Sequence, residues 1–387
     1  MRASRGPIIV FGILFWYPLA GVTYQFLHYL IALRQLGWDP YYVEDSQRWL
    51  FDPDLNNTTP MPQASIARIA PVLEAHGFGD HWAYRSHHEG GRVYGIGEAR
   101  LKVLYREAAA MLNVTGSQEL RDEHLAGPRR IYVESDPVKS QIEVAAGDVE
   151  LIRVLSQHDT LFTFGENLGQ PDCGVPLERF TWLPTRQPVV LDLWTPPTGD
   201  GGAYTTIATW SSRNDVVYRG QTYYWSKDRE YEKVLDLPRR RRGPFELATQ
   251  VDAPTAARLA AHGWRVSRAY EVSRGLGRYH AYIGDSRAEF TVAKDQNVRL
   301  RSGWFSDRSA CYLAAGRPVI TQDTGFGNVL PTGKGLFAFR DLDDVLAAVD
   351  AIESDYEGQR RAAREIAAEH FDAAKVVGSL LERAGLG

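Results

Sequence analysis

The stretch Arg299–Gly327, RLRSGWFSDRSACYLAAGRPVITQDTGFG, is the most informative part of the sequence. Small and apolar residues over Asp307–Ala315 predict a short helix, which Gly316 ends. The run Pro318–Thr321 has the composition of a buried strand, and Gln322–Gly327 is polar and glycine-rich. The stretch therefore predicts a helix, a strand and a polar turn in direct succession.

The start of this helix has features of an anion site. Ser306 or Asp307 can cap it by accepting hydrogen bonds from its free N–H groups. A helix start also carries partial positive charge and binds phosphate readily. Arg299, Arg301 and Arg308 crowd it, although cations are unfavourable at this end of a helix. A bound anion would explain the arrangement; a solvated turn with scattered arginines is the alternative.

This succession resembles the donor half of the GT-B glycosyltransferases. The resembling part is Tyr204–Phe371, and AAGRPVITQDTGFG is its most specific piece. The resemblance implies an α/β fold of two Rossmann-like, doubly wound domains that face each other across a cleft. It also implies a C-terminal helix that crosses back to the first domain. Many retaining members carry a ribose-binding glutamate five residues before the glycine of this motif. Here that position is Cys311, and Asp307, one turn earlier, is the candidate substitute.

Length and composition favour a two-domain globular protein. The chain has 387 residues, too many for one ordinary core, with 44% hydrophobic and 24% charged residues. Its net charge of −4 provides no overall basic field, so we expect no nucleic-acid partner. Cys173 and Cys311 cannot form a disulfide framework, and reduced thiols indicate a cytoplasmic protein. The apolar run Pro7–Ala20 is too short to span a bilayer and predicts a buried strand.

We expect an N-terminal acceptor domain over residues 1–198, with an irregular insertion at about 46–100. A donor domain would cover 199–370, and a C-terminal helix or tail over 371–387 would pack on the first domain. Apolar runs predict strands at residues 8–15, 40–43, 130–134, 160–164, 189–194, 204–210, 244–248, 289–293 and 336–339. Helical patterns lie at residues 23–36, 98–112, 151–155, 253–262, 272–283, 341–352 and from 356 onward.

Two carboxylates follow strands of the first domain and are candidate catalytic bases. Asp136 comes after RIYVE, and Glu166 comes after the strand at 160–164. Open α/β sheets bind ligands at the carboxyl ends of their strands, although such acids also cap helices and turns. His28, on the first helix, is a third candidate, with a core-edge position as the alternative. Retaining GT-B enzymes use no such base, so the stereochemistry stays open.

The resemblance also implies a donor site in the second domain. Ser211, Arg213 and Lys227 follow its first strand, where the diphosphate is met. The other expected donor contacts, to phosphate, ribose or sugar, are Arg301, Ser306, Asp307, Arg308, Ser309, Asp323, Thr324 and Gly325. Because no metal motif is visible, cations and helix N–H groups must stabilise the leaving diphosphate. The expected cleft contacts in the first domain are Gly21, Tyr24 and Arg186.

These features predict a metal-independent glycosyltransferase that uses a UDP- or dTDP-type sugar and holds no permanent cofactor. The acceptor would be a small molecule or a glycan, and a homodimer is left open. Three alternatives remain. The first is an epimerase or phosphorylase on the same fold, and the second is a transferase acting on nucleic-acid bases. The third is a non-catalytic protein that binds a sugar or nucleotide.

Overall fold

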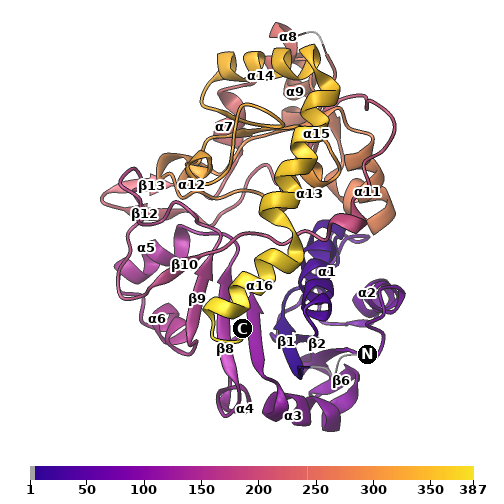
Figure 1. The fold of residues 1–387 in the computed structure, drawn as a ribbon, viewed down its shortest axis with the longest axis vertical. Coiled ribbons are helices and arrows are strands. Elements are labelled where there is room, and N and C mark those ends of the chain that lie inside the picture. Colours follow the sequence, from indigo (N-terminus) through magenta and orange to yellow (C-terminus); the bar gives the residue numbers. More distant parts are fainter. Residues whose placement is uncertain (1–4, 242) are drawn as a thin grey trace.

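Two parallel sheets, each flanked by helices, form two domains stacked along the long axis of the molecule (Figure 1). The computed structural model describes residues 5–241 and 243–387. The N-terminal sheet has eight strands in the order β10-β9-β8-β7-β1-β2-β5-β6, and the C-terminal sheet has six in the order β15-β14-β11-β16-β17-β18. Only β5 and β6 pair antiparallel within these two sheets. The fold is the expected pair of doubly wound α/β domains.

The N-terminal domain alternates strands and helices. Its strands are β1 (Pro7–Phe11), β2 (Asp39–Glu44), β5 (Trp82–Ser86), β6 (Arg92–Gly95), β7 (Ala110–Val114), β8 (Arg129–Glu134), β9 (Thr160–Thr163) and β10 (Trp182–Pro184), with a hairpin of β3 (Leu50–Asp52) and β4 (Asn57–Thr59). Its helices are α1 (Ala20–Gln35), α2 (Gln63–Ala75), α3 (Gly97–Glu107), α4 (Asp122–Leu125), α5 (Lys139–Ala145) and α6 (Val149–Ser156). The central strand β1 is fully buried from Ile8 to Phe11, as parallel strands covered on both faces are.

The predicted strand over residues 8–15 is shorter than expected. It ends at Phe11, although the apolar run continues. The Glu44 carboxylate at the end of β2 accepts hydrogen bonds from the backbone N–H groups of Phe15, at 2.8 Å, and Trp16, at 2.7 Å. The apolar residues after β1 therefore form a buried loop, shaped by a side chain that local sequence does not reveal.

Two further predictions for this domain were wrong. The segment 46–100 was expected to be irregular, but much of it is regular structure outside the β3–β4 hairpin. It contains the helix α2 and the strand β5, which pairs parallel with β2 and extends the sheet. The helix expected over 98–112 ends at Glu107, and β7 begins at Ala110 and pairs with β1. The apolar run of β7 continues the helical pattern of the residues before it. It forms a strand because it pairs with β1 and β8, not because of its own periodicity.

The C-terminal domain repeats the alternation. Its strands are β11 (Tyr204–Ala208), β14 (Phe245–Thr249), β15 (Arg265–Ser267), β16 (Ala288–Thr291), β17 (Val319–Gln322) and β18 (Leu336–Phe339), with a hairpin of β12 (Val216–Tyr218) and β13 (Gln221–Tyr223). Its helices are α7 (Asp228–Glu232), α8 (Leu237–Arg240), α9 (Ala253–Ala261), α10 (Ala269–Ser273), α11 (Leu276–Gly284), α12 (Asp295–Arg299), α13 (Asp307–Ala314), α14 (Leu342–Ser354) and α15 (Tyr356–Ile366). The expected helix over 272–283 is divided at Gly275 into α10 and α11.

The C-terminal end of the chain returns to the first domain. After α15, α16 (Ala373–Arg383) packs against α1 and places Val377, Leu380 and Leu381 in the N-terminal core (Figure 1). The residues expected as a strand at 189–194 form a single bridge, between Val189 and Asp372, followed by a short 3-10 helix over Leu191–Leu193. The two segments of chain that pass between the domains, one at Val189 and one at Asp372, therefore lie side by side. Among the described residues, no helix has the length and apolar character needed to cross a membrane.

Candidate active site

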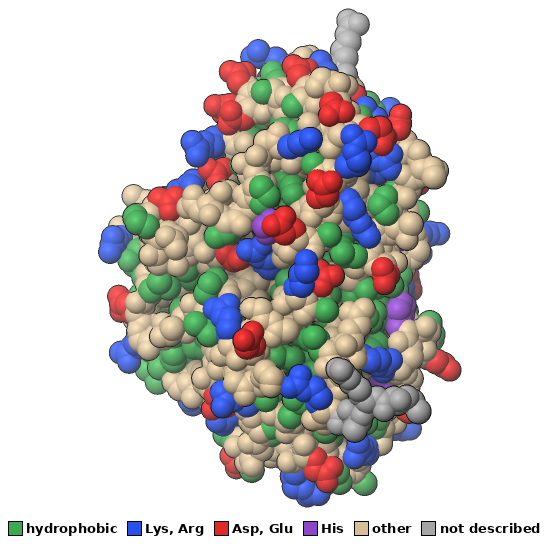
Figure 2. Space-filling view, viewed as in Figure 1, with side chains coloured by type: hydrophobic (Ala, Val, Ile, Leu, Met, Phe, Trp, Pro, Cys, Tyr) green, Lys and Arg blue, Asp and Glu red, His purple; other side chains and the backbone are tan. Residues whose placement is uncertain are grey.

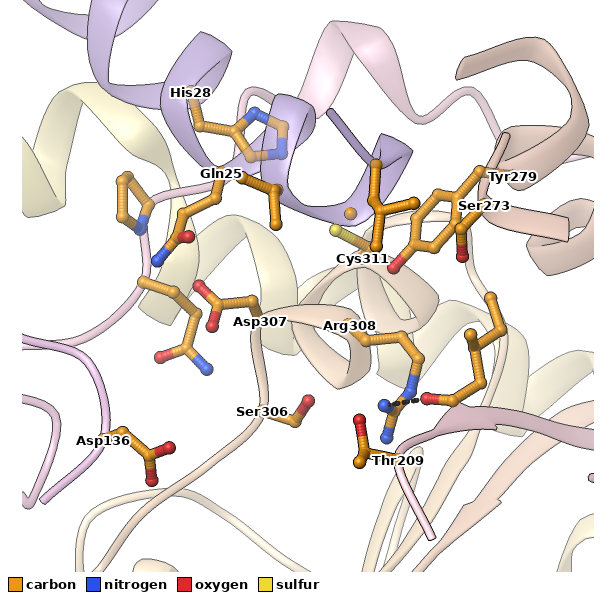
Figure 3. A pocket seen from close by; sticks show the side chains of 16 residues that line it. Gln25, His28, Asp136, Thr209, Ser273, Tyr279, Ser306, Asp307, Arg308 and Cys311 are labelled. Carbon is orange, nitrogen blue, oxygen red and sulfur yellow. Dashed lines mark hydrogen bonds between the residues drawn. The ribbon is translucent and has the colours of Figure 1, made fainter. Parts of the chain in front are cut away.

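A cleft between the two domains contains two cavities of about 430 Å³ each. The first is lined from the N-terminal domain by α1 and the tip of β8, and from the C-terminal domain by the start of α13 (Figure 3). Residues that line both cavities are Leu19, Ile207, Thr209, Ser273, Ser306 and Arg308. Because the cavities share these walls, they lie next to each other in the cleft. A third cavity of about 800 Å³ shares Gln250 with the second.

The start of α13 lies at the centre of this cleft, as the sequence predicts. Ser306 occupies the N-cap position, but its side chain makes no capping hydrogen bond. Asp307 faces the first cavity, and burial raises the pKa of its carboxyl to about 7. Cys311, one turn later, lines the same cavity. The helix start therefore presents a hydroxyl and a carboxyl, with no side-chain cap over its free N–H groups.

Arg308 points from α13 toward the C-terminal sheet (Figure 3). Its Nε lies 2.5 Å from Oε1 of Glu289, which is fully buried in β16. Its other nitrogens donate to the hydroxyl of Thr291, at 2.9 Å, and to the carbonyl of Ile207. The charge of Arg308 is thus balanced within the protein, while part of its side chain forms a wall of both cavities.

Lys227 is the unbalanced cation of the cleft. It lines the second cavity with only 7% of the residue exposed. Its ammonium lies 5.8 Å from the ring centroid of Trp304, and among the described residues it has no ion pair or hydrogen bond. Burial, and then the charges of Arg308 and Lys294, hold its pKa well below the ordinary value. A buried ammonium without an anion is costly, so this site favours a negatively charged ligand.

The structure places Asp136 in the cleft, whereas Glu166 does not line any of the three cavities. Asp136 lines the first cavity and forms an ion pair with Lys294 of the other domain. Glu166 forms an ion pair of 2.6 Å with Arg186, the predicted cleft residue. Burial raises the pKa of Glu166, and Arg186 opposes this shift.

His28 also lines the first cavity, but its ring is engaged by the protein. Its Nδ1 accepts a hydrogen bond of 3.0 Å from the backbone N–H of Val190. Burial lowers its pKa to about 3, so the ring is neutral near pH 7. Of the other two cleft predictions, Gly21 lines the cavity, and Tyr24 packs against Trp194 with ring centroids 4.7 Å apart.

Several predicted donor residues lie outside the first two cavities. Ser211 lines the third cavity, and Arg213 is exposed and lines none of the three. Ser309 is fully buried, with its hydroxyl unpartnered. The turn after β17 contacts the N-terminal domain at another place. There Arg301 pairs with Asp172 and Asp323, Thr324 donates to the carbonyl of Trp304, and Gly325 packs against Asn167.

The sequence prediction of the donor site did not include Lys294, Trp225 and Trp304, which line the second cavity. Lys294 follows the end of β16, so the rule that identified Asp136 could also have identified it. The two tryptophans lie on irregular segments, and no sequence pattern marked them. Gln25 and Tyr279 of the first cavity were likewise not predicted.

One group outside the cleft has the composition of a metal site. Ligand atoms of Asp45, Glu123 and His124 lie within 4.8 Å of one another. Asp45, however, already pairs with Arg85 at 3.2 Å and with Arg121. Two guanidinium groups on the central carboxylate satisfy its charge, so the group is better described as a buried ion-pair network.

No family model matches the sequence, and no curated protein matches it. The structure is similar to an α-glucosyltransferase (AGT) in complex with UDP, with a TM-score of 0.59, 9% identity and coverage of 98% of this chain and 99% of that one. An α-glucosyltransferase in complex with UDP-glucose and DNA containing an abasic site gives a TM-score of 0.60, with 9% identity and coverage of 99% of both chains. Anabaena Alr3699/HepE in complex with UDP and glucose gives 0.56, with 10% identity and coverage of 98% and 99%. At these identities the similarity establishes the GT-B fold.

Proposed function

We propose that this GT-B chain is a glycosyltransferase that moves a sugar from a nucleoside diphosphate sugar to an acceptor nucleophile. The observation that supports this most directly is Lys227, a buried lysine with no ion-pair partner among the described residues, on the wall of a cleft between two Rossmann-like domains. The neighbours of the same fold bind UDP or UDP-glucose, in agreement with a diphosphate at this position.

The diphosphate would lie between Lys227 and the start of α13, where Ser306 lines both cavities and no side chain caps the first N–H groups of the helix. These groups would stabilise the negative charge that develops on the leaving group, so the proposal requires no metal ion. Arg308 would shape this site and add positive potential, although Glu289 balances its charge.

Asp136 is the best-placed base, because it lines the first cavity and is held from the opposite domain. The acceptor O–H bond would break as its oxygen bonds the anomeric carbon, and the proton would pass to Asp136. The bond from that carbon to the diphosphate oxygen would break, and the nucleoside diphosphate would leave with the electron pair. Asp307, across the first cavity, would accept hydrogen bonds from sugar hydroxyls.

The acceptor is proposed to be a small molecule or a glycan. Figure 2 shows acidic and basic side chains interspersed over one face of the molecule, without a continuous basic surface. Nucleic-acid binding depends mainly on such a surface. One structural neighbour nevertheless binds DNA, so an acceptor screen should include oligonucleotides.

A thermal-shift screen with UDP-, dTDP-, GDP- and ADP-sugars tests the proposal. A ligand present at about 100 times its dissociation constant should stabilise the protein by about 2.7 kcal/mol. The sugar that binds is then incubated with an acceptor library, and release of the nucleoside diphosphate is measured. Absence of binding to every nucleotide sugar would contradict the proposal. Interconversion of nucleotide sugars without an acceptor would instead indicate an epimerase, and phosphate-dependent release of a sugar phosphate a phosphorylase.

A further inference from the structure

The three residues that follow β8, residues 135–137, each contact the C-terminal domain. Indole Nε1 of Trp304 donates to the carbonyl of Ser135, at 3.0 Å, and the amide of Gln296 donates to the carbonyl of Pro137, at 3.3 Å. Between these two bonds, the side chain of Asp136 pairs with Lys294. Backbone and side chain of this tip are therefore both positioned by the C-terminal domain.

Lys294 neutralises the negative charge of the Asp136 carboxylate. Among the described residues, Lys294 is the only ion-pair partner of Asp136, and it contacts Oδ2 alone. The second carboxylate oxygen, Oδ1, is buried and has no hydrogen-bond partner. Without Lys294, this partly buried carboxylate, whose side chain is 30% exposed, would keep no direct cationic partner among the described residues and would be driven to take up a proton or to turn toward solvent.

Lys294 is in turn held in place for this contact. Its ammonium lies 3.6 Å from the ring centroid of Trp225, in a cation–π contact, and 16% of its side chain is exposed. It lines the second cavity, whereas Asp136 lines the first. The pair therefore joins the two cavities as well as the two domains.

We propose that Lys294 is a positioning residue of the transferase. From the C-terminal domain it orients the Asp136 carboxylate at the cavity wall and keeps it charged, so that Asp136 can act only when the two domains are together. The inference rests on the proposed function, in which Asp136 takes the proton of the acceptor. It assigns Lys294 an action through Asp136, not a contact with the sugar.

The test is a double-mutant cycle with Lys294→Met and Asp136→Asn. Donor affinity and kcat for transfer are measured for the wild type, both single variants and the double variant. Each single substitution should lower kcat at least about tenfold and change the donor dissociation constant less than about threefold. The double variant should be no slower than Asp136→Asn, within about twofold, because Lys294 has no further role once the carboxylate is absent. Lys294→Arg should recover part of the lost kcat, since it keeps the charge.

Two outcomes would overturn the inference. Losses in kcat that multiply in the double variant would show that Lys294 acts independently of Asp136. Weaker donor binding by Lys294→Met with unchanged kcat would make it a phosphate contact. Lys334→Met is the matched control, because Lys334 is an exposed lysine of the same domain and lines none of the three cavities described above.

Melting temperatures of the same four proteins separate this inference from the proposed function. Lys294→Met alone should melt below the wild type, because it leaves the partly buried Asp136 without its ion-pair partner. The double variant should recover part of that loss, whereas shifts that simply add would refute the pairing in solution. A wild-type protein that binds no nucleotide sugar would contradict the proposed function and leave this coupling measurable.

Discussion

Nε of Arg308 lies 2.5 Å from Oε1 of Glu289, so the first turn of α13 is tied to the buried strand β16. The sequence predicted Arg308 as a direct contact to the diphosphate or ribose of the donor. In the structure, the guanidinium of Arg308 is already paired with Glu289, and the side chain forms part of the cavity wall. This difference sets two expectations, one for stability and one for binding.

Arg308→Ala should destabilise the protein by about 3–5 kcal/mol, because it leaves the fully buried Glu289 without its partner. We also expect at least tenfold weaker nucleotide binding, about 1.4 kcal/mol, since the cleft loses a wall and positive potential. Urea unfolding and calorimetry measure the two effects. Unchanged affinity would remove Arg308 from the donor site. A paired Arg308→Met, Glu289→Gln variant controls for the stability loss and should unfold later than Arg308→Ala.

Lys227→Met should weaken the binding of a nucleoside diphosphate more than that of the free nucleoside. We expect a loss of about 10- to 100-fold for the diphosphate, equivalent to about 1.4–2.8 kcal/mol, because no described residue forms an ion pair with this ammonium, whose contact is with the Trp304 ring. Calorimetry with both ligands measures the difference, and Lys334→Met is the control. Equal losses for nucleoside and diphosphate would place Lys227 away from the phosphates. Because Lys227 is buried without an anion, the variant should also be at least as stable as the wild type.

Asp136→Asn and Glu166→Gln should differ sharply in turnover. Loss of a general base slows a reaction by about 10²–10⁴-fold, and we expect this for Asp136→Asn with donor affinity retained. Glu166 pairs with Arg186 and does not line the cleft cavities, so Glu166→Gln should keep kcat within about threefold. Steady-state rates with a saturating donor compare the two. Equal rates for both variants, near the wild type, would exclude either carboxylate as the base.

His28 should contribute a dependence of stability on pH. Burial lowers its pKa to about 3, below the ordinary value of 6.5, so the unfolded chain binds this proton first. The free energy of unfolding should therefore fall as the pH falls from 6.5 toward about 3, by up to about 1.4 kcal/mol per pH unit from this group. In His28→Asn, the side-chain oxygen can still accept from Val190, but this titration is absent. Urea unfolding between about pH 7 and pH 4 should give a shallower curve for the variant, and parallel curves would contradict the assignment.

Much of the fold was predictable because strands and helix ends leave local signals. The apolar run of β8 and the glycine after α13 indicated their elements within a few residues. The prediction failed at β7, whose sequence also continues a helical pattern, and at the loop after β1, which Glu44 holds in place. In both places a distant partner decides the backbone.

The site was predicted as residue types at strand and helix ends, but not as a set of contacts. Asp136, Asp307 and Lys227 were identified by position and lie in the cleft. Ser309, Arg213 and Glu166 were identified by the same reasoning and lie outside the first two cavities. Position at the end of an element brings a residue near the cleft, but the direction of the side chain depends on packing that the sequence does not show.

The sequence by itself determined the alternation of strands and helices and the edge of each sheet at which polar groups gather, because hydrophobic periodicity and turn residues act over short distances. Only the tertiary structure decided which charges are balanced and which are free. Lys294 and Asp136 pair across 158 residues and two domains, Arg308 turns to Glu289, and Lys227 has no ion-pair partner among the described residues. The state of a charge in a protein depends on its neighbours within a few ångströms, and those neighbours come together only in the folded tertiary structure.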